Sequence, residues 1–241
     1  MIKLTRRELA LMIGAGAIAH RAIGTEAPVE LPGVVGLAEA RADLGKPLGR
    51  DVARAAVARS VQAAVGEESA GAAAARLFRP GDTVGIKVNC LAGRNLSPRV
   101  ELVEALVDLI AGTGVDRRRI IIFERSSREL RRAGFTLSAS GPPYKCVGTD
   151  NDYDSRPSDS GSIGSCFARL VSTECTALVS FGVVKDHDLS GISAGMKNWY
   201  GVIHNPNKYH DNGCDPYIAD VARHPYIRSK LRLTVLDGVV A

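Results

Sequence analysis

The sequence predicts a three-layer α/β fold, in which a mostly parallel sheet carries helices on both faces in a Rossmann-like arrangement. Short continuous apolar runs, typical of strands buried on both faces, alternate with longer segments of helical periodicity. Strands that alternate with helices at these spacings favour a parallel sheet. The chain has 241 residues, of which 45% are hydrophobic, so it can bury one sizeable core.

The first 24 residues have the order of a secretory leader. Arg6 and Arg7 stand directly before the uncharged apolar run 11–19, and a polar stretch follows it. This layout is typical of the twin-arginine route. We therefore expect residues 1–24 to be a signal peptide and the protein to be periplasmic or extracellular.

The remainder divides into an arm and a folded body. Residues 25–47 are expected to form a linker or arm because three prolines interrupt them. Residues 48–241 are expected to form a single α/β domain. The chain ends soon after the last predicted strand, so we expect this domain to be truncated at its C-terminus.

Helical and strand patterns alternate through the first half of the body. The Ala-rich stretches 50–65 and 68–78 favour helices, and a Pro-Gly-Asp turn separates them from a strand at 83–88. Ser97 and Pro98 predict the N-terminus of a third helix, with Ser97 as its N-cap. This helix should run to Gly112 or Gly114.

The second half repeats the pattern. The apolar run 119–123 predicts a strand buried on both faces, followed by a short helix that Ser126 or Ser127 caps and Gly134 ends. A further buried strand is expected at 176–184 and a last one at 231–236.

Composition argues against two classes of partner. The net charge of +5 comes partly from the predicted leader, and aromatic residues make up only 5% of the chain. The body thus has neither the basic excess nor the stacking residues that nucleic-acid binding requires. The apolar run of the leader is about half the ~20 residues that a transmembrane helix needs, so no permanent membrane span is expected.

Polar residues follow several of the predicted strands. Asn89 and Cys90 follow the first, Glu124 ends the second, 185–187 follow the third and Asp237 follows the last. Because ligands of open α/β sheets bind beyond the carboxyl ends of the strands, we expect these residues at one edge. Cys90 is either a thiolate nucleophile or an inert buried thiol.

Residues 185–215 concentrate the reactive side chains. Lys185, His187 and Lys197 are candidate catalytic residues, able to act as acid, base or covalent amine if their surroundings shift their pKa values toward neutrality. Between them lies a glycine-rich segment that predicts an anion or cofactor site. The residues of that predicted site are Gly191, Ser193, Gly195, Lys197 and Asn198.

Alternatives remain for this segment. The glycines can instead serve tight packing, and the pattern lacks the Gly-Lys-Ser/Thr ending of a phosphate-binding Walker loop. His204, His210 and Cys214 are candidate ligands for zinc, iron or nickel, although their spacing matches no standard structural zinc site. A histidine beside Asn-Pro-Asn can equally stabilise a turn.

Four stretches resemble the domain-of-unknown-function family 362 over roughly residues 48–241. They read VGIKVNC, SPRVELVEALVDLI, IIIFERSS and VVKDHDLSGISAGMKNWYGVIHNPNKYH. Some members of that family carry a ferredoxin-like iron–sulfur domain, but this chain has no Cys-x-x-Cys. The segment SGISAGMK is also similar to a loop of the nickel-dependent lactate racemase family, which implies Lys197 as a cofactor anchor.

These observations predict an exported enzyme that depends on a transition metal or another cofactor and performs redox or isomerase chemistry on a small anionic substrate. The alternative is a non-catalytic binding or assembly subunit of an exported redox complex. We also expect a homo-oligomer or a partner subunit, because no helix follows strand 231–236 to cover its apolar faces. An upstream helix or the arm is the alternative cover.

Overall fold

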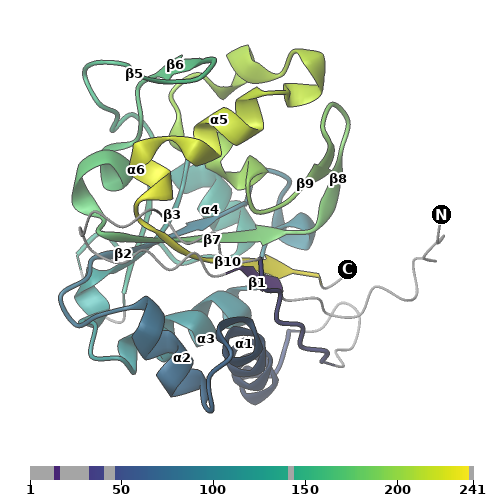
Figure 1. The fold of residues 1–241 in the computed structure, drawn as a ribbon, viewed down its shortest axis with the longest axis vertical. Coiled ribbons are helices and arrows are strands. Elements are labelled where there is room, and N and C mark those ends of the chain that lie inside the picture. Colours follow the sequence, from purple (N-terminus) through teal and green to yellow (C-terminus); the bar gives the residue numbers. More distant parts are fainter. Residues whose placement is uncertain (1–13, 17–32, 41–46, 141–143, 239–241) are drawn as a thin grey trace.

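The computed structural model describes residues 14–16, 33–40, 47–140 and 144–238. Its centre is a sheet with the strand order β1-β10-β7-β2-β3-β4 (Figure 1). The strands are β1 (Gly14–Gly16), β10 (Leu231–Asp237), β7 (Ala177–Val183), β2 (Val84–Val88), β3 (Ile120–Glu124) and β4 (Lys145–Gly148). All neighbours are parallel except β1 and β10, which are antiparallel. The predicted fold class is confirmed.

Helices lie on both sides of the sheet (Figure 1). One side carries α1 (Arg50–Val65), α2 (Ala70–Leu77) and α3 (Val100–Ala111), and α4 (Ser127–Ala133) packs into the same apolar cluster. The other side carries the π-helix η3 (Leu170–Glu174), the 3-10 helix η4 (Lys197–Val202), α5 (Tyr217–Arg223) and α6 (Pro225–Arg228).

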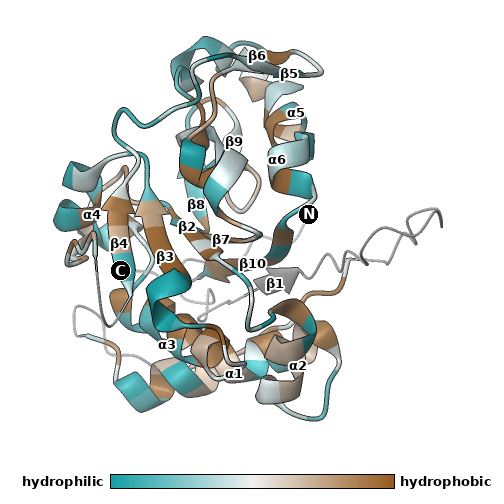
Figure 2. Ribbon diagram, turned by 90° about the vertical axis from the view of Figure 1, so that its left-hand side faces the viewer, coloured by the Kyte–Doolittle hydropathy of each residue, from teal (hydrophilic) through white to brown (hydrophobic). Residues whose placement is uncertain are grey.

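Alternation along the strands explains why the runs are apolar throughout. In β3, Ile120 and Ile122 pack into the cluster on the α1 side, whereas Ile121 and Phe123 pack into the cluster on the other side. Successive side chains of a strand point to opposite faces, so a strand covered on both faces needs apolar residues at every position. Figure 2 shows hydrophobic residues along the central strands.

Local signals set most helix ends, with one correction. Ser126 caps α4 by accepting a hydrogen bond from the Arg128 amide, and Gly134 ends the helix with φ 98°, as predicted. The predicted cap Ser97 does not cap α3, whose N-cap residue is Arg99. Ser97 Oγ instead donates to the Gly93 carbonyl at 2.6 Å, because the loop before α3 includes the 3-10 helix η1 (Arg94–Leu96).

Short elements in the polar loops were not predicted. Two antiparallel hairpins form, β5 (Ser158–Ser160) with β6 (Ile163–Ser165), and β8 (Lys185–His187) with β9 (Gly191–Ser193). Three further 3-10 helices are η2 (Arg117–Arg119), η5 (Pro206–Tyr209) and η6 (Asn212–Cys214). Strands of three residues are too short to show a clear alternation of apolar and polar positions.

The last strand is partly covered within the chain. Leu233 and Val235 of β10 are fully buried in the cluster that includes α1, and β1 pairs along the outer edge of β10. One apolar face of this strand is therefore covered, whereas the other face, with Arg232, Thr234 and Leu236, is half-buried. Upstream helices supply the cover of the first face.

The described part of the arm packs onto the domain. Ala38 is buried in the α1-side cluster, and a Cβ atom on Gly36 would meet the Ser60 carbonyl of α1. β1 comes from the apolar run of the predicted leader, whereas the arginine pair and the rest of the leader lie outside the described residues. None of the described helices has the length and hydropathy needed to cross a membrane.

Candidate functional site

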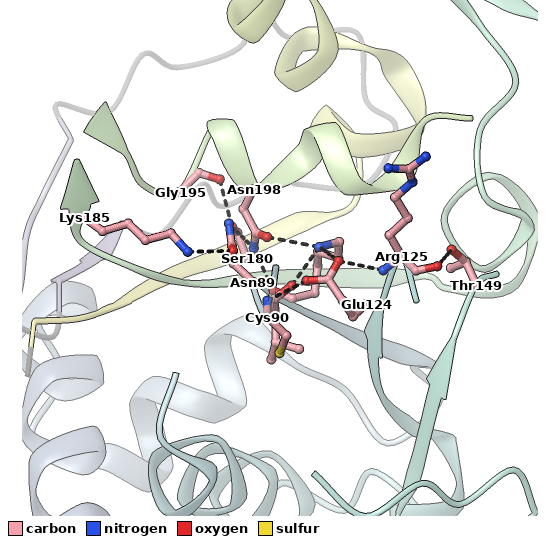
Figure 3. Close-up of polar contacts among 11 residues, drawn as sticks. Asn89, Cys90, Glu124, Arg125, Thr149, Ser180, Lys185, Gly195 and Asn198 are labelled. Atoms are coloured by element: carbon pink, nitrogen blue, oxygen red, sulfur yellow. Dashed lines mark hydrogen bonds and ion pairs between the residues drawn. The ribbon is translucent and has the colours of Figure 1, made fainter. Parts of the chain in front are cut away.

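The strand ends converge as predicted. Glu124 Oε2 accepts a hydrogen bond from the Cys90 amide at 2.8 Å, which joins the ends of β2 and β3. Lys185 Nζ donates to Asn89 Oδ1 at 3.1 Å, so the chain after β7 meets the chain after β2 (Figure 3). Asp237 stands apart with a different partner, since it accepts from the Arg99 amide at 3.0 Å.

A buried ion pair lies at the centre of this edge. Lys87 Nζ is 2.7 Å from Glu124 Oε1, and the two side chains are only 2% and 4% exposed. The ammonium group also donates to the Val88 carbonyl at 2.7 Å and to Asn198 Oδ1 at 3.1 Å. All three protons of the ammonium group therefore have acceptors, as a charge removed from water requires.

Asn198 connects this pair to η4 (Figure 3). Its Nδ2 donates to the Lys87 carbonyl at 2.8 Å and to Ser180 Oγ at 3.1 Å. Ser180 Oγ donates in turn to the Gly195 carbonyl at 2.9 Å. We call Lys87, Cys90, Glu124, Ser180 and Asn198 the strand-end network. It anchors the start of η4 to three strands of the sheet.

A second group of side chains, the lysine–histidine cluster, lies directly beside this anchor. It consists of His187, Lys197, Tyr200, His210 and Cys214. Lys197 Nζ is 3.0 Å from His210 Nε2 and 3.8 Å from the centroid of the Tyr200 ring. The Cys214 side chain also contacts Lys197 and Tyr200. The cluster thus joins η4 to the segment around η5 and η6.

Backbone contacts orient the two imidazole rings. His210 Nδ1 lies 3.0 Å from the Pro206 carbonyl, which can only accept, so Nδ1 carries the proton and Nε2 faces Lys197 as an acceptor. His187 Nδ1 accepts from the Leu189 amide at 3.2 Å. The rings of His187 and His210 stack with centroids 5.8 Å apart.

Burial shifts the titration of the cluster. Desolvation lowers the pKa of the Lys197 ammonium below its ordinary value, against a smaller opposing effect of Cys214. Desolvation and the neighbouring Lys197 charge also lower the pKa values of His187 and His210. The geometry thus favours neutral imidazoles and eases the loss of a proton from Lys197.

The predicted anion cradle is occupied by contacts within the protein. Gly191 closes the β8–β9 hairpin opposite His187, and a Cβ atom on Gly195 would lie 2.4 Å from Thr234 Cγ2. The buried Ser193 pairs with Lys185, and the Asn198 side chain belongs to the strand-end network. Gly195 therefore serves tight packing, which was the alternative interpretation of the glycines.

Of the three predicted metal ligands, His210 and Cys214 both belong to the cluster around Lys197, whereas His204 does not. The described residues hold no group of three or more His, Cys, Asp or Glu side chains placed to bind a metal ion. His210 uses both ring nitrogens in the contacts above, and the Cys214 side chain contacts Lys197 and Tyr200. His204 packs edge-on against the Tyr153 ring, at 5.5 Å between centroids, away from the cluster.

Sequence reasoning missed Lys87, Ser180 and Tyr200. The available signal was a lysine in the middle of the otherwise apolar run of β2, where a charge needs a buried partner. The inert interpretation of Cys90 fits the structure, since the residue is 1% exposed and burial raises the pKa of its thiol. All five cysteines are free thiols.

A cavity of about 220 Å³ lies elsewhere, between α1 and α3 on the opposite side of the sheet. Its charged groups neutralise one another. Asp108, for example, accepts from Arg54 at 2.9 Å and from Arg117 at 2.6 Å. The cavity therefore offers a ligand few free charges.

Comparison with known proteins identifies the family of this chain. No curated protein matches the chain. The family described as "Domain of unknown function (DUF362)" matches residues 84–241, which is more than half of the chain and includes both the strand-end network and the lysine–histidine cluster. The match begins at β2, later than the resemblance read from the sequence. The chain therefore belongs to the DUF362 family.

Proposed function

We propose that this protein is an enzyme that performs acid–base chemistry, such as an isomerisation, on a small anionic substrate at the lysine–histidine cluster. One observation carries the proposal: Lys197 Nζ lies 3.0 Å from an imidazole nitrogen that can accept its proton. A lysine and a histidine in hydrogen-bond contact can transfer a proton between them, and the lowered pKa of Lys197 makes the release of its proton easier.

The roles follow from the tautomers. His210, fixed by the Pro206 carbonyl, accepts the proton that Lys197 releases. The neutral amine can then remove a proton from a substrate C–H. Once protonated, the ammonium group can donate a proton to the substrate. The strand-end network holds η4 rigidly through Asn198, so the amine stays in place during the transfer.

The charges near the cluster favour an anion. Lys197 and Lys185 each lower the pKa of His187, so both ammonium groups lie within electrostatic reach of that imidazole. Lys185 has neutral hydrogen-bond partners, Asn89 Oδ1 and the Leu96 carbonyl. The positive charge of these lysines favours a carboxylate or phosphate. Export, dependence on a metal or other cofactor, and redox chemistry remain predictions from the sequence.

Exchange of substrate protons with solvent tests the proposal without knowledge of the full reaction. A panel of small 2-hydroxy, 2-oxo and 2-amino carboxylates would be incubated with the protein in D₂O, and loss of the Cα proton followed by NMR. We expect exchange with at least one compound and a decrease of about 100-fold in the Lys197→Gln variant. Lys208→Gln, in the same segment, is the control. Absence of exchange, or equal exchange in both variants, would refute the proposal.

A binding or assembly subunit is the second candidate, favoured by exposed apolar side chains beside the cluster. Leu189, Ile192 and Met196, in and after the β8–β9 hairpin, are 55%, 54% and 59% exposed. Neighbouring exposed apolar side chains often mark a protein interface. If this candidate is right, Leu189→Ser with Ile192→Ser abolishes a pull-down interaction, and Lys197→Gln leaves it unchanged.

A further inference from the structure

The lysines of this protein differ in what holds their ammonium groups. Lys87 is neutralised by Glu124, and Lys185 and Lys230 donate to neutral oxygens. Lys197 is different, because its partners are a nitrogen base, His210 Nε2, and the Cys214 side chain. Within the described ranges no carboxylate forms an ion pair with it.

These surroundings suit an amine nucleophile. A carboxylate partner would keep the ammonium ion charged, whereas the neutral ring of His210 can accept its proton and the face of Tyr200 holds the cation only weakly. Burial acts in the same direction, since it lowers the pKa of Lys197. Lys197 is buried, with 8% of the residue exposed. A small molecule must therefore displace neighbouring side chains to reach the amine.

We infer that Lys197 forms a Schiff base with the carbonyl group of a small anionic aldehyde or 2-oxo acid. The inference rests on the proposed acid–base function and names its substrate class. An imine would also assist the proposed acid–base step. The protonated imine withdraws electrons, so the adjacent C–H of the substrate loses its proton more easily.

The step balances without an oxidant or reductant. His210 Nε2 takes one proton from the Lys197 ammonium group, and the free amine attacks the carbonyl carbon, so a C–N bond forms and the carbonyl π bond breaks. The oxygen takes a second proton from the attacking nitrogen. His210 then returns the first proton to the hydroxyl group, which leaves as water while the C=N bond forms. The products are a protonated imine, one water molecule and neutral His210.

Lys185 supplies the preference for an anion. It is the first residue of β8, in the hairpin that also carries His187, and it donates hydrogen bonds to neutral oxygens. A substrate carboxylate beside the reacting carbonyl could pair with the Lys185 ammonium group without displacing an existing ion pair. Between a charged and a neutral carbonyl compound of similar size, the charged one should therefore react faster at Lys197.

Reductive trapping tests the inference. The protein would be incubated at pH 7.5 with glyoxylate or with the neutral glycolaldehyde, reduced with cyanoborohydride and digested, and the adducts assigned by mass spectrometry. Lys208, which is exposed in the same segment, is the internal control. We expect glyoxylate to modify Lys197 at least about tenfold faster than Lys208, since His210 is placed to take the proton from Lys197.

The outcomes separate this inference from the proposed function. Lys197→Arg should abolish only the fast adduct, His210→Gln should slow it about 100-fold, and glycolaldehyde should show less preference for Lys197. Equal labelling of Lys197 and Lys208 would overturn the inference. If proton exchange still depends on Lys197, the acid–base function stands without the imine. Absence of both signals rejects both.

Discussion

The buried pair of Lys87 and Glu124 gives the sharpest test of the architecture. In the Glu124→Gln variant the side chain keeps its shape but loses its charge. The Lys87 ammonium group then remains between β2 and η4 with only neutral acceptors, the Val88 carbonyl and Asn198 Oδ1. We expect a large loss of stability, because an uncompensated charge stays buried.

The magnitude follows from the burial. The two side chains are 2% and 4% exposed with a separation of 2.7 Å, so removal of one partner should cost about 3–5 kcal/mol. For a chain of this length that corresponds to a decrease in Tm of roughly 6–20 °C. The Glu67–Arg76 pair is the matched control, since it has the same separation of 2.7 Å with side chains 25% and 63% exposed. Glu67→Gln should cost less than about 1 kcal/mol.

Urea unfolding followed by circular dichroism measures both variants. A double variant, Lys87→Met with Glu124→Gln, removes the stranded charge and should recover at least about 2 kcal/mol of the loss. It also keeps the test decisive if Glu124→Gln alone does not fold. The reasoning fails if Glu124→Gln costs no more than Glu67→Gln, or if the double variant is less stable than Glu124→Gln.

Three further predictions concern packing, pH and export. Gly201→Ala places a Cβ atom 2.6 Å from Lys87 Nζ and should cost about 1–3 kcal/mol in urea unfolding, whereas Gly71→Ala, in the first turn of α2, should cost nothing. Burial lowers the pKa of His224 below its ordinary 6.5, so the unfolded chain takes up a proton that the folded chain resists. Stability should therefore fall as the pH decreases from 7 to 5, and a melting curve of His224→Gln should depend less on pH in that window. Replacement of Arg6 and Arg7 by lysine should keep the protein in the cytoplasm on cell fractionation, and unchanged export would contradict the predicted leader.

Periodicity and punctuation in the sequence determined the architecture. The apolar runs of β2, β3 and β7 have no alternation, so both faces of these strands had to be covered, and the intervening helices gave a parallel sheet. The rule that ligands gather at the carboxyl ends of such strands also brought Asn89, Cys90, Glu124 and Lys185 to one edge correctly. These are consequences of local pattern and of sheet geometry.

The partners of the polar side chains were decided only by the tertiary structure. Asn198 meets Lys87 across 111 residues of chain, and Lys197 meets His210 through a loop built of short 3-10 turns. Such contacts leave no periodic trace in the sequence. The metal set of His204, His210 and Cys214 was chosen by residue type within one segment, and the fold places His204 on Tyr153 while His210 and Cys214 contact Lys197. A side chain's partners depend on where packing of the core places distant segments, so chemistry that needs two such partners becomes visible only in the folded protein.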